Sequence, residues 1–118
     1  MNSAFWSSLD ELVAKSKIVI DRPKGTSHPR FPGLIYPLDY GYLDNTSSND
    51  GASLDLYLGT VPQKELPAVI ITTDLYKRDV EVKLIISCSA SEIKIAYEHS
   101  NTGYMHALLV LRNDNPEL

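Results

Sequence analysis

Apolar residues near the start of the chain recur at helical spacing. Phe5, Leu9, Leu12 and Val13 fall on one side of a helix, so residues 3–15 are predicted to form an amphipathic helix. Such a helix has one apolar face, and we expect that face to pack against the rest of the domain.

A second helix is predicted in the last third of the chain. Ser89 and Glu92 have the spacing of a capping box, in which two side chains satisfy free backbone N–H groups of the first helical turn. We expect this helix to begin at Ser89 and to continue to about His99. Gly103 is expected to cap its end, because glycine readily takes the left-handed conformation found there.

Short β-rich runs predict five strands, which cover residues 17–21, 53–59, 67–74, 78–88 and 106–112. Between the first two runs, residues 22–37 contain four prolines and two glycines, which predicts an ordered loop with little regular structure. Short strands separated by turns, with two small helices, predict an α+β fold with a small, mostly antiparallel sheet or barrel. Periodicity does not distinguish a barrel from an open sheet.

The strand predicted over residues 78–88 has regular alternation, and side chains alternate between the two faces of a strand. One face is apolar and is expected to pack inward against the helices, and the other is expected to face a polar cavity. The apolar face carries Val80, Val82, Leu84 and Ile86, and the polar face carries Asp79, Glu81 and Lys83.

The bulk composition is that of a soluble globular protein. With 118 residues, 43% of them hydrophobic and 22% charged, the chain is expected to form a single domain over residues 1–118. A lone Cys88 excludes an internal disulfide, and the N-terminus lacks a signal-peptide pattern, so we expect a cytoplasmic protein. No apolar run approaches the roughly 20 residues of a membrane helix. The net charge of −4 argues against nucleic acid as a partner.

Four aspartates occupy turns beside predicted strands. Asp50 and Asp55 lie at either end of a glycine turn, and Asp74 and Asp79 lie at either end of a four-residue reversal. Carboxylates that converge repel one another unless a cation lies between them, and oxygen ligands suit Mg²⁺, Mn²⁺ or Ca²⁺ better than zinc. The alternative is that these are solvated turn residues, which aspartate beside glycine often is.

The segment 36–55, YPLDYGYLDNTSSNDGASLD, resembles the signature of the soluble inorganic pyrophosphatases, a YPxNYGY-like stretch followed about ten residues later by DGDPxD. The run TTD, four residues, D at 72–79 resembles the second aspartate pair of that family. Upstream, IVIDRPKG resembles the family's strand that ends in an acid followed by proline. The resemblance covers roughly residues 17–88.

This resemblance implies a fold and a reaction. The fold is an α+β domain with a small OB-like, mostly antiparallel β-barrel and two flanking helices. The reaction is Mg²⁺-dependent hydrolysis of pyrophosphate or a related phosphoanhydride by a metal-activated water, with Mn²⁺ as the alternative ion. The implied metal ligands are Asp50, Asp55, Asp74 and Asp79, and Asp50, Asp55 and Tyr40 are the implied catalytic residues.

The resemblance also implies residues that bind the phosphates. Arg30 falls where the family has a lysine, and Tyr40 where it has a phosphate-binding tyrosine. Lys83 falls near another family lysine, with Glu81 as the alternative in strict register. Lys24 belongs to a basic loop, residues 22–30, that is expected to cradle phosphate oxygens; a solvated basic loop is the other interpretation. The sequence leaves a homo-oligomer open.

The chain departs from the family pattern at the expected general base. Ala52 stands in place of the middle aspartate of DGDPxD, and a positioned base contributes about 10² to 10⁴ in rate. His28 is a candidate replacement, because its ordinary pKa lies near neutrality. The alternative function is therefore an impaired member that binds a divalent metal and a phosphorylated ligand without turnover.

Overall fold

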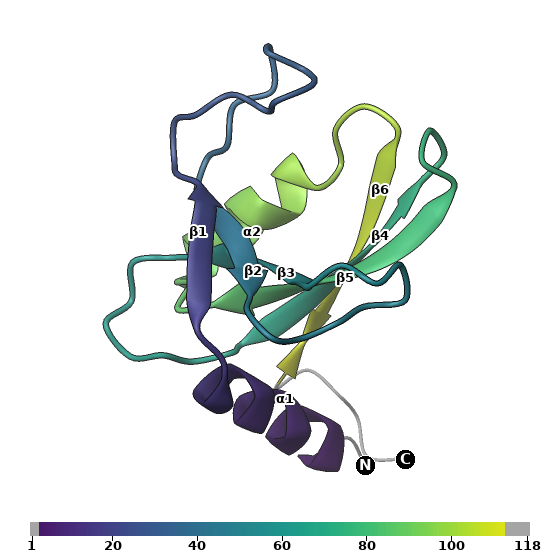
Figure 1. Cartoon of the computed structure of the whole chain (residues 1–118). Helices are drawn as coiled ribbons and strands as arrows, with labels where there is room; N and C mark the ends of the chain where they lie inside the picture. The colour runs from purple at the N-terminus through teal and green to yellow at the C-terminus, as the bar shows by residue number, and fades with distance from the viewer. Residues whose placement is uncertain (1–2, 113–118) are drawn as a thin grey trace.

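The computed structural model describes residues 3–112, which form one six-stranded sheet with a helix on each face (Figure 1). The helices are α1 (Ser3–Lys15) and α2 (Ala90–His99). The strands are β1 (Ile18–Arg22), β2 (Asp39–Leu43), β3 (Leu54–Leu58), β4 (Ala68–Asp74), β5 (Asp79–Ile86) and β6 (Met105–Leu111). None of the helices in this part of the chain has the length and apolar character needed to cross a membrane.

The α+β class and the mostly antiparallel sheet are confirmed. Strands follow the order β1-β2-β3-β5-β4-β6, and of the neighbouring pairs β3 and β5 alone run parallel. Both predicted helices and all five predicted strands are present. The strand that sequence analysis missed is β2, because its tyrosines, glycine and aspartate give it little apolar alternation.

The closed barrel is not confirmed. A barrel requires the first and last strands of the sheet to pair, whereas β1 and β6 are the two ends of the strand order and do not pair within residues 3–112. At the β1 end the strands approach closely at Gly41. A Cβ atom there would lie 1.8 Å from the carbonyl oxygen of Val19, so this position accepts no side chain.

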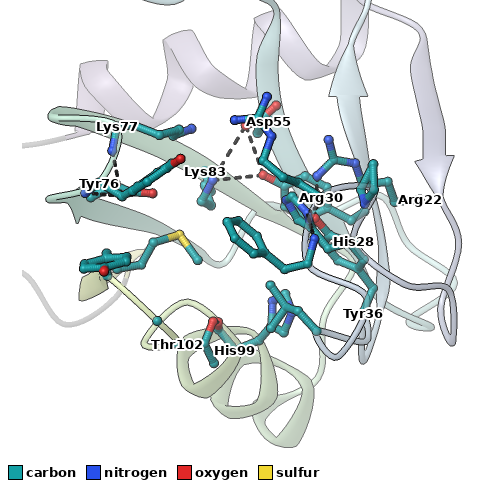
Figure 2. Close-up of a pocket in the computed structure, with 18 of the residues that line it drawn as sticks. Arg22, His28, Arg30, Tyr36, Asp55, Tyr76, Lys77, Lys83, His99 and Thr102 are labelled. Atoms are coloured by element: carbon teal, nitrogen blue, oxygen red, sulfur yellow. Dashed lines mark hydrogen bonds and ion pairs between the residues drawn. The ribbon is translucent and has the colours of Figure 1, made fainter.

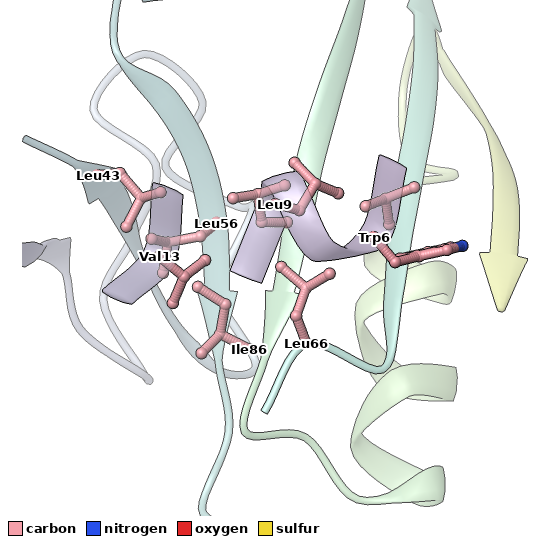
Figure 3. Close-up of a cluster of buried hydrophobic side chains, with 9 residues drawn as sticks. Trp6, Leu9, Val13, Leu43, Leu56, Leu66 and Ile86 are labelled. Atoms are coloured by element: carbon pink, nitrogen blue, oxygen red, sulfur yellow. The ribbon is translucent and has the colours of Figure 1, made fainter. Parts of the chain in front are cut away.

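The first hydrophobic core lies between α1 and one face of the sheet (Figure 3). Trp6, Leu9 and Val13 of α1 are buried against Leu56 and Ile86 of the sheet. Burying such side chains contributes about 1.5–3 kcal/mol each, which offsets the conformational entropy lost in the helix.

An ion pair fixes α1 to the far end of β6. The guanidinium of Arg112 donates to both carboxylate oxygens of Asp10, at 2.8 and 2.7 Å, and its Cζ atom lies 5.6 Å from the ring centroid of Trp6. Bidentate pairs of this kind are among the stronger charged hydrogen bonds. The contact therefore joins the first helix to the last strand.

The second core lies between α2 and the opposite face of the sheet, where Ala96 is buried with Tyr57 and Ile85. The predicted capping box is present at Ser89 and Glu92. The predicted cap at Gly103 is wrong, because the helix ends at His99 with Ser100 as its cap. Gly103 instead takes a positive φ of 60° in the turn that leads into β6.

The predicted burial of β5 is wrong at its first half. Leu84 and Ile86 are fully buried, but Val82 is 39% exposed and Val80 is 60% exposed. All four lie on the face of the sheet that α1 covers, but only Leu84 and Ile86 belong to the core beneath α1. The alternation of the sequence gives the face of each side chain but not the extent of the helix above it.

This difference along one strand face is measurable. Leu84→Ala is expected to lower the free energy of unfolding by about 2–5 kcal/mol, because it leaves a cavity in the core. Val82→Ala is expected to cost about 1 kcal/mol or less, because its side chain already meets solvent. Urea denaturation of both variants tests the assignment, and equal losses would show that α1 covers the whole strand.

Candidate functional site

A cavity of about 950 Å³ opens on the α2 side of the sheet (Figure 2). Its floor is formed by side chains of β2, β3 and β5, and its walls by the loop after β1, the β4–β5 turn and the residues that follow α2. The floor carries Tyr40, Asp55, Tyr57, Glu81 and Lys83.

Lys83 lies at the centre of this floor and is 5% exposed. Its ammonium donates to the hydroxyl of Tyr40 at 2.9 Å and to Glu81 Oε2 at 3.1 Å, and it lies 3.6 Å from Asp55 Oδ2. Burial opposes the charge, but the carboxylates of Asp55 and Glu81 outweigh it and raise the pKa of Lys83. Lys83 is therefore a permanent cation at the base of the cavity.

Tyr40 is held by the same network. Its hydroxyl donates to Asp55 Oδ2 at 3.0 Å while it accepts from Lys83. Burial, followed by the nearby charge of Asp55, raises the pKa of Tyr40 well above 10, so the phenol keeps its proton. The structure thus brings together three of the predicted site residues, Tyr40, Asp55 and Lys83.

Three carboxylates form a second group beside this network. Asp50, Asp79 and Glu81 each offer one oxygen, and these oxygens lie within 4.8 Å of one another. Lys77 closes the group, with its ammonium 2.7 Å from Glu81 Oε1 and 3.5 Å from Asp79 Oδ2. Asp55 and Asp74, predicted as ligands with Asp50 and Asp79, are not in this group.

The charges of this group shift the titration of its members. Burial raises the pKa of Asp79, and its contact with Glu81 adds to the rise. For Glu81 the ammonium groups of Lys83 and Lys77 outweigh the effect of burial, and its pKa falls to about 2. Glu81 is therefore ionised at neutral pH, held between two lysines.

Asp74 has a local role that explains its absence from the carboxylate group. Its Oδ1 accepts the backbone N–H groups of Tyr76 at 2.9 Å and Lys77 at 3.1 Å, which fixes the β4–β5 turn. Aspartate often forms such turns with the residues that follow it. Of the other predicted substrate-binding residues, Arg30 lines the cavity, whereas Lys24 does not.

The loop after β1 contributes donors to the cavity. His28 Nδ1 accepts the backbone N–H groups of Arg30 and Phe31 at 3.0 and 3.2 Å. Since Nδ1 is an acceptor, the ring proton is on Nε2, so His28 presents a donor rather than the base that we considered for it. Arg22 donates to the hydroxyl of Tyr36 and lines the same wall.

His99 forms a buried chain of hydrogen bonds in the lining of the cavity. Its Nδ1 lies 2.7 Å from the hydroxyl of Tyr57, which lies 3.2 Å from Ser100 Oγ. Ser100 in turn donates to the carbonyl of Ala96 at 2.8 Å. Burial, and then the charge of Lys83, lowers the pKa of His99 below 6.5. The His99 ring packs beside Tyr36 and Tyr57, and the lowered pKa keeps it neutral at pH 7.

No protein-family model matches the chain, but individual proteins are similar to it. An inorganic pyrophosphatase of Corynebacterium glutamicum is 46% identical to it over 41 residues, which are 35% of this chain and 25% of that protein. An inorganic pyrophosphatase of Neisseria gonorrhoeae has the same fold, with a TM-score of 0.60 at 18% identity, over 75% of this chain and 77% of that chain. One from Helicobacter pylori has a TM-score of 0.57 at 16% identity, over 83% and 84% of the two chains.

The chain therefore has the fold of the inorganic pyrophosphatases and is similar to one of them in sequence over a single segment. At these identities the solved structures show the shared fold alone, and the sequence match spans a quarter of the curated relative's length.

Sequence reasoning missed part of this site. The sequence predicts that Glu81 faces the polar cavity but does not predict it as a metal ligand, although its place on the polar face of β5 beside Asp79 is a signal for the carboxylate group. Lys77 lies in a turn, and Tyr76 and Tyr104 lie in two turns far apart in the sequence. No pattern in the sequence links these three residues, because only the folded sheet brings their turns together.

The neutral state of His99 predicts a pH dependence of stability. The unfolded chain binds a proton at His99 near pH 6.5, whereas the folded chain does so only at lower pH. Stability contributed by His99 is therefore present above pH 6.5 and is lost as the pH falls below it. His99→Gln, which retains a polar group for Tyr57, is expected to flatten this decline.

Urea denaturation at about pH 7 and about pH 5.5 provides the measurement. The drop in unfolding free energy between the two should be smaller in His99→Gln than in the unchanged protein. His106→Gln, at an exposed position on β6, is the matched control and should leave the drop unaltered. Identical drops in all three proteins would contradict the buried neutral state.

Proposed function

We propose that this chain hydrolyses phosphoanhydrides, with inorganic pyrophosphate as the simplest substrate, in a reaction that depends on Mg²⁺ or Mn²⁺. The observation that carries the proposal is the group of three carboxylates, Asp50, Asp79 and Glu81, beside a cavity with a buried lysine at its base. The pyrophosphatase fold and the shared sequence segment support the same reaction.

The carboxylate group fits a divalent cation. Its donors are all oxygens, as hard cations prefer. Asp79 Oδ1 is buried and has no hydrogen-bond partner among the described residues. An unpaired buried carboxylate oxygen destabilises the fold unless a cation or a hydrogen-bond donor binds it. Asp50, Asp79 and Glu81 would hold the ion, which when bound would supply positive charge to the phosphate oxygens and lower the pKa of water.

Side chains of the chain itself would bind the substrate. Lys83 and Arg30 line the cavity as cations, and His28 presents its Nε2–H as a donor. Arg22 stands on the same wall. Phosphoryl transfer needs positioning and charge neutralisation more than covalent chemistry, and such donors provide both. Tyr40 acts by orientation, since its hydroxyl connects Lys83 to Asp55.

Proton removal from the attacking water is the step for which this chain is least equipped. Ala52, which stands where the family has its middle aspartate, has no proton acceptor in its side chain. Asp74 is engaged in its turn, and Asp55 lines the cavity with one oxygen held by Tyr40. We therefore assign proton acceptance to Asp55, and expect turnover to be slow.

The central test is phosphate release from pyrophosphate with Mg²⁺, with Mn²⁺ and with a chelator. Release is expected only with metal. Asp79→Asn and Glu81→Gln are each expected to raise the Mg²⁺ concentration for half-maximal rate at least about tenfold, because each removes one ligand charge. Glu11→Gln, at an exposed position on α1, is the matched control. Metal binding by calorimetry without any phosphate release would instead favour the impaired binding protein.

The missing acceptor generates a second prediction. Ala52 is exposed, and its backbone N–H donates to Asp50 Oδ1 at 2.9 Å, so a carboxylate at this position would lie next to the metal group. Ala52→Asp is expected to raise kcat about tenfold, which is below the range of about 10² to 10⁴ for a positioned base because Asp55 already serves. Ala52→Asn is the control, because asparagine has nearly the same size as aspartate but does not act as a base. Equal kcat values for both variants would assign the gain to something other than proton transfer.

A further inference from the structure

Three aromatic rings stand exposed at the mouth of the cavity. Tyr104 is 60% exposed, Tyr76 59% and Phe31 49%. They come from three separate segments, which are the turn before β6, the β4–β5 turn and the loop after β1. Large apolar rings gathered in solvent at one place are unusual on a protein surface and often mark a binding site.

The rings are arranged as a wall. The rings of Tyr76 and Tyr104 are nearly parallel, with centroids 5.7 Å apart and an interplanar angle of 26°. The ring of Phe31 meets Tyr76 edge-on, with centroids 6.4 Å apart at 79°. This leaves ring faces and edges available to a planar group that enters the cavity.

Backbone contacts hold the wall in place. Asp74 Oδ1 accepts the N–H of Tyr76, and the N–H of Leu75 donates to the carbonyl of Tyr104 at 3.4 Å. The two turns that carry the tyrosines are therefore joined to each other. A surface that is ordered before it binds loses less conformational entropy on binding.

The cavity is larger than inorganic pyrophosphate requires. Sites of about 300–1,000 Å³ hold ligands of drug size, and the cavity here reaches about 950 Å³. Two phosphate groups held over Lys83 at the floor would leave the space along the aromatic wall empty. A ligand that fills both parts carries phosphates at one end and a planar ring at the other.

We propose that the cavity binds nucleoside di- and triphosphates, with the phosphates over Lys83 and the base against Tyr76 and Tyr104. This assignment rests on the proposed phosphoanhydride function and names its substrate class. Stacking on an aromatic side chain is favourable for every base, so the wall is expected to select nucleotides without strong preference among them.

Calorimetric titration with Mg²⁺ tests this assignment separately from catalysis. The probes are inorganic triphosphate and a non-hydrolysable, imido-linked adenosine triphosphate analogue. The nucleotide analogue is expected to bind at least about tenfold more tightly. Tyr76→Ala and Tyr104→Ala are each expected to weaken the analogue about tenfold and to leave inorganic triphosphate unchanged. Tyr76→Phe, which keeps the ring, and Leu75→Ala, an exposed neighbour outside the cavity lining, are expected to change neither.

The outcomes separate the two proposals. Equal affinities for the two probes, or equal losses of both on ring removal, would overturn the nucleotide assignment while phosphate release from pyrophosphate could still stand. Ring-dependent binding of the analogue in a protein that releases no phosphate would support the nucleotide site and overturn the hydrolase. Failure of both probes to bind would overturn the nucleotide assignment, and the phosphate-release assay with pyrophosphate would decide the hydrolase separately.

Discussion

The pocket floor depends on one buried charge. Lys83 is almost fully enclosed, and an ammonium in such a place is tolerated only when opposite charges and hydrogen-bond acceptors surround it. Its partners come from three adjacent strands, with Tyr40 on β2, Asp55 on β3 and Glu81 on β5 itself. Removal of the lysine would leave two carboxylates crowded together, and removal of the carboxylates would leave a buried ammonium. Each member of the network therefore needs the others. All four side chains line the cavity.

The same face of the sheet serves as a hydrophobic core farther along each strand. On β5 the polar Lys83 is followed two residues later by Ile85, and on β3 Asp55 is followed by Tyr57. Residues two apart in a strand lie on the same face. On each strand, the first residue of the pair therefore lines the cavity and the second belongs to the hydrophobic core. Helix α2 covers the apolar part and leaves the charged part open to the loops. The length and position of α2, fixed at its start by the Ser89 capping box, thus determine where the core ends and the cavity begins.

Much of this arrangement could be predicted from the sequence, and the rest could not, for physical reasons. Helices and strands follow from periodicity. The family resemblance implied that four aspartates share an ion, and of these four the structure places Asp50 near Asp79. Burial could not be predicted in the same way. Val82 lies on the same strand face as the buried Leu84, but it is partly exposed because α1 does not cover it. The carboxylate of Asp74 could bind either a shared ion or the N–H groups of its own turn, and the sequence does not decide between them. In the structure it accepts hydrogen bonds from the N–H groups of Tyr76 and Lys77. The wall of Tyr76 and Tyr104 joins two turns that only the paired strands bring together.

Charge balance links the carboxylate group to the rim of the cavity. The ammonium of Lys77 balances part of the charge of Asp79 and Glu81, at 3.5 and 2.7 Å. An ion held by the same oxygens, as we propose, would compete with this ammonium, and a doubly charged cation interacts about twice as strongly at equal distance. The backbone of Lys77 is fixed by Asp74, so a displaced side chain would remain at the rim beside Tyr76. Lys77 already lines the cavity, so its ammonium would be available to a phosphorylated ligand at the place where the aromatic wall begins.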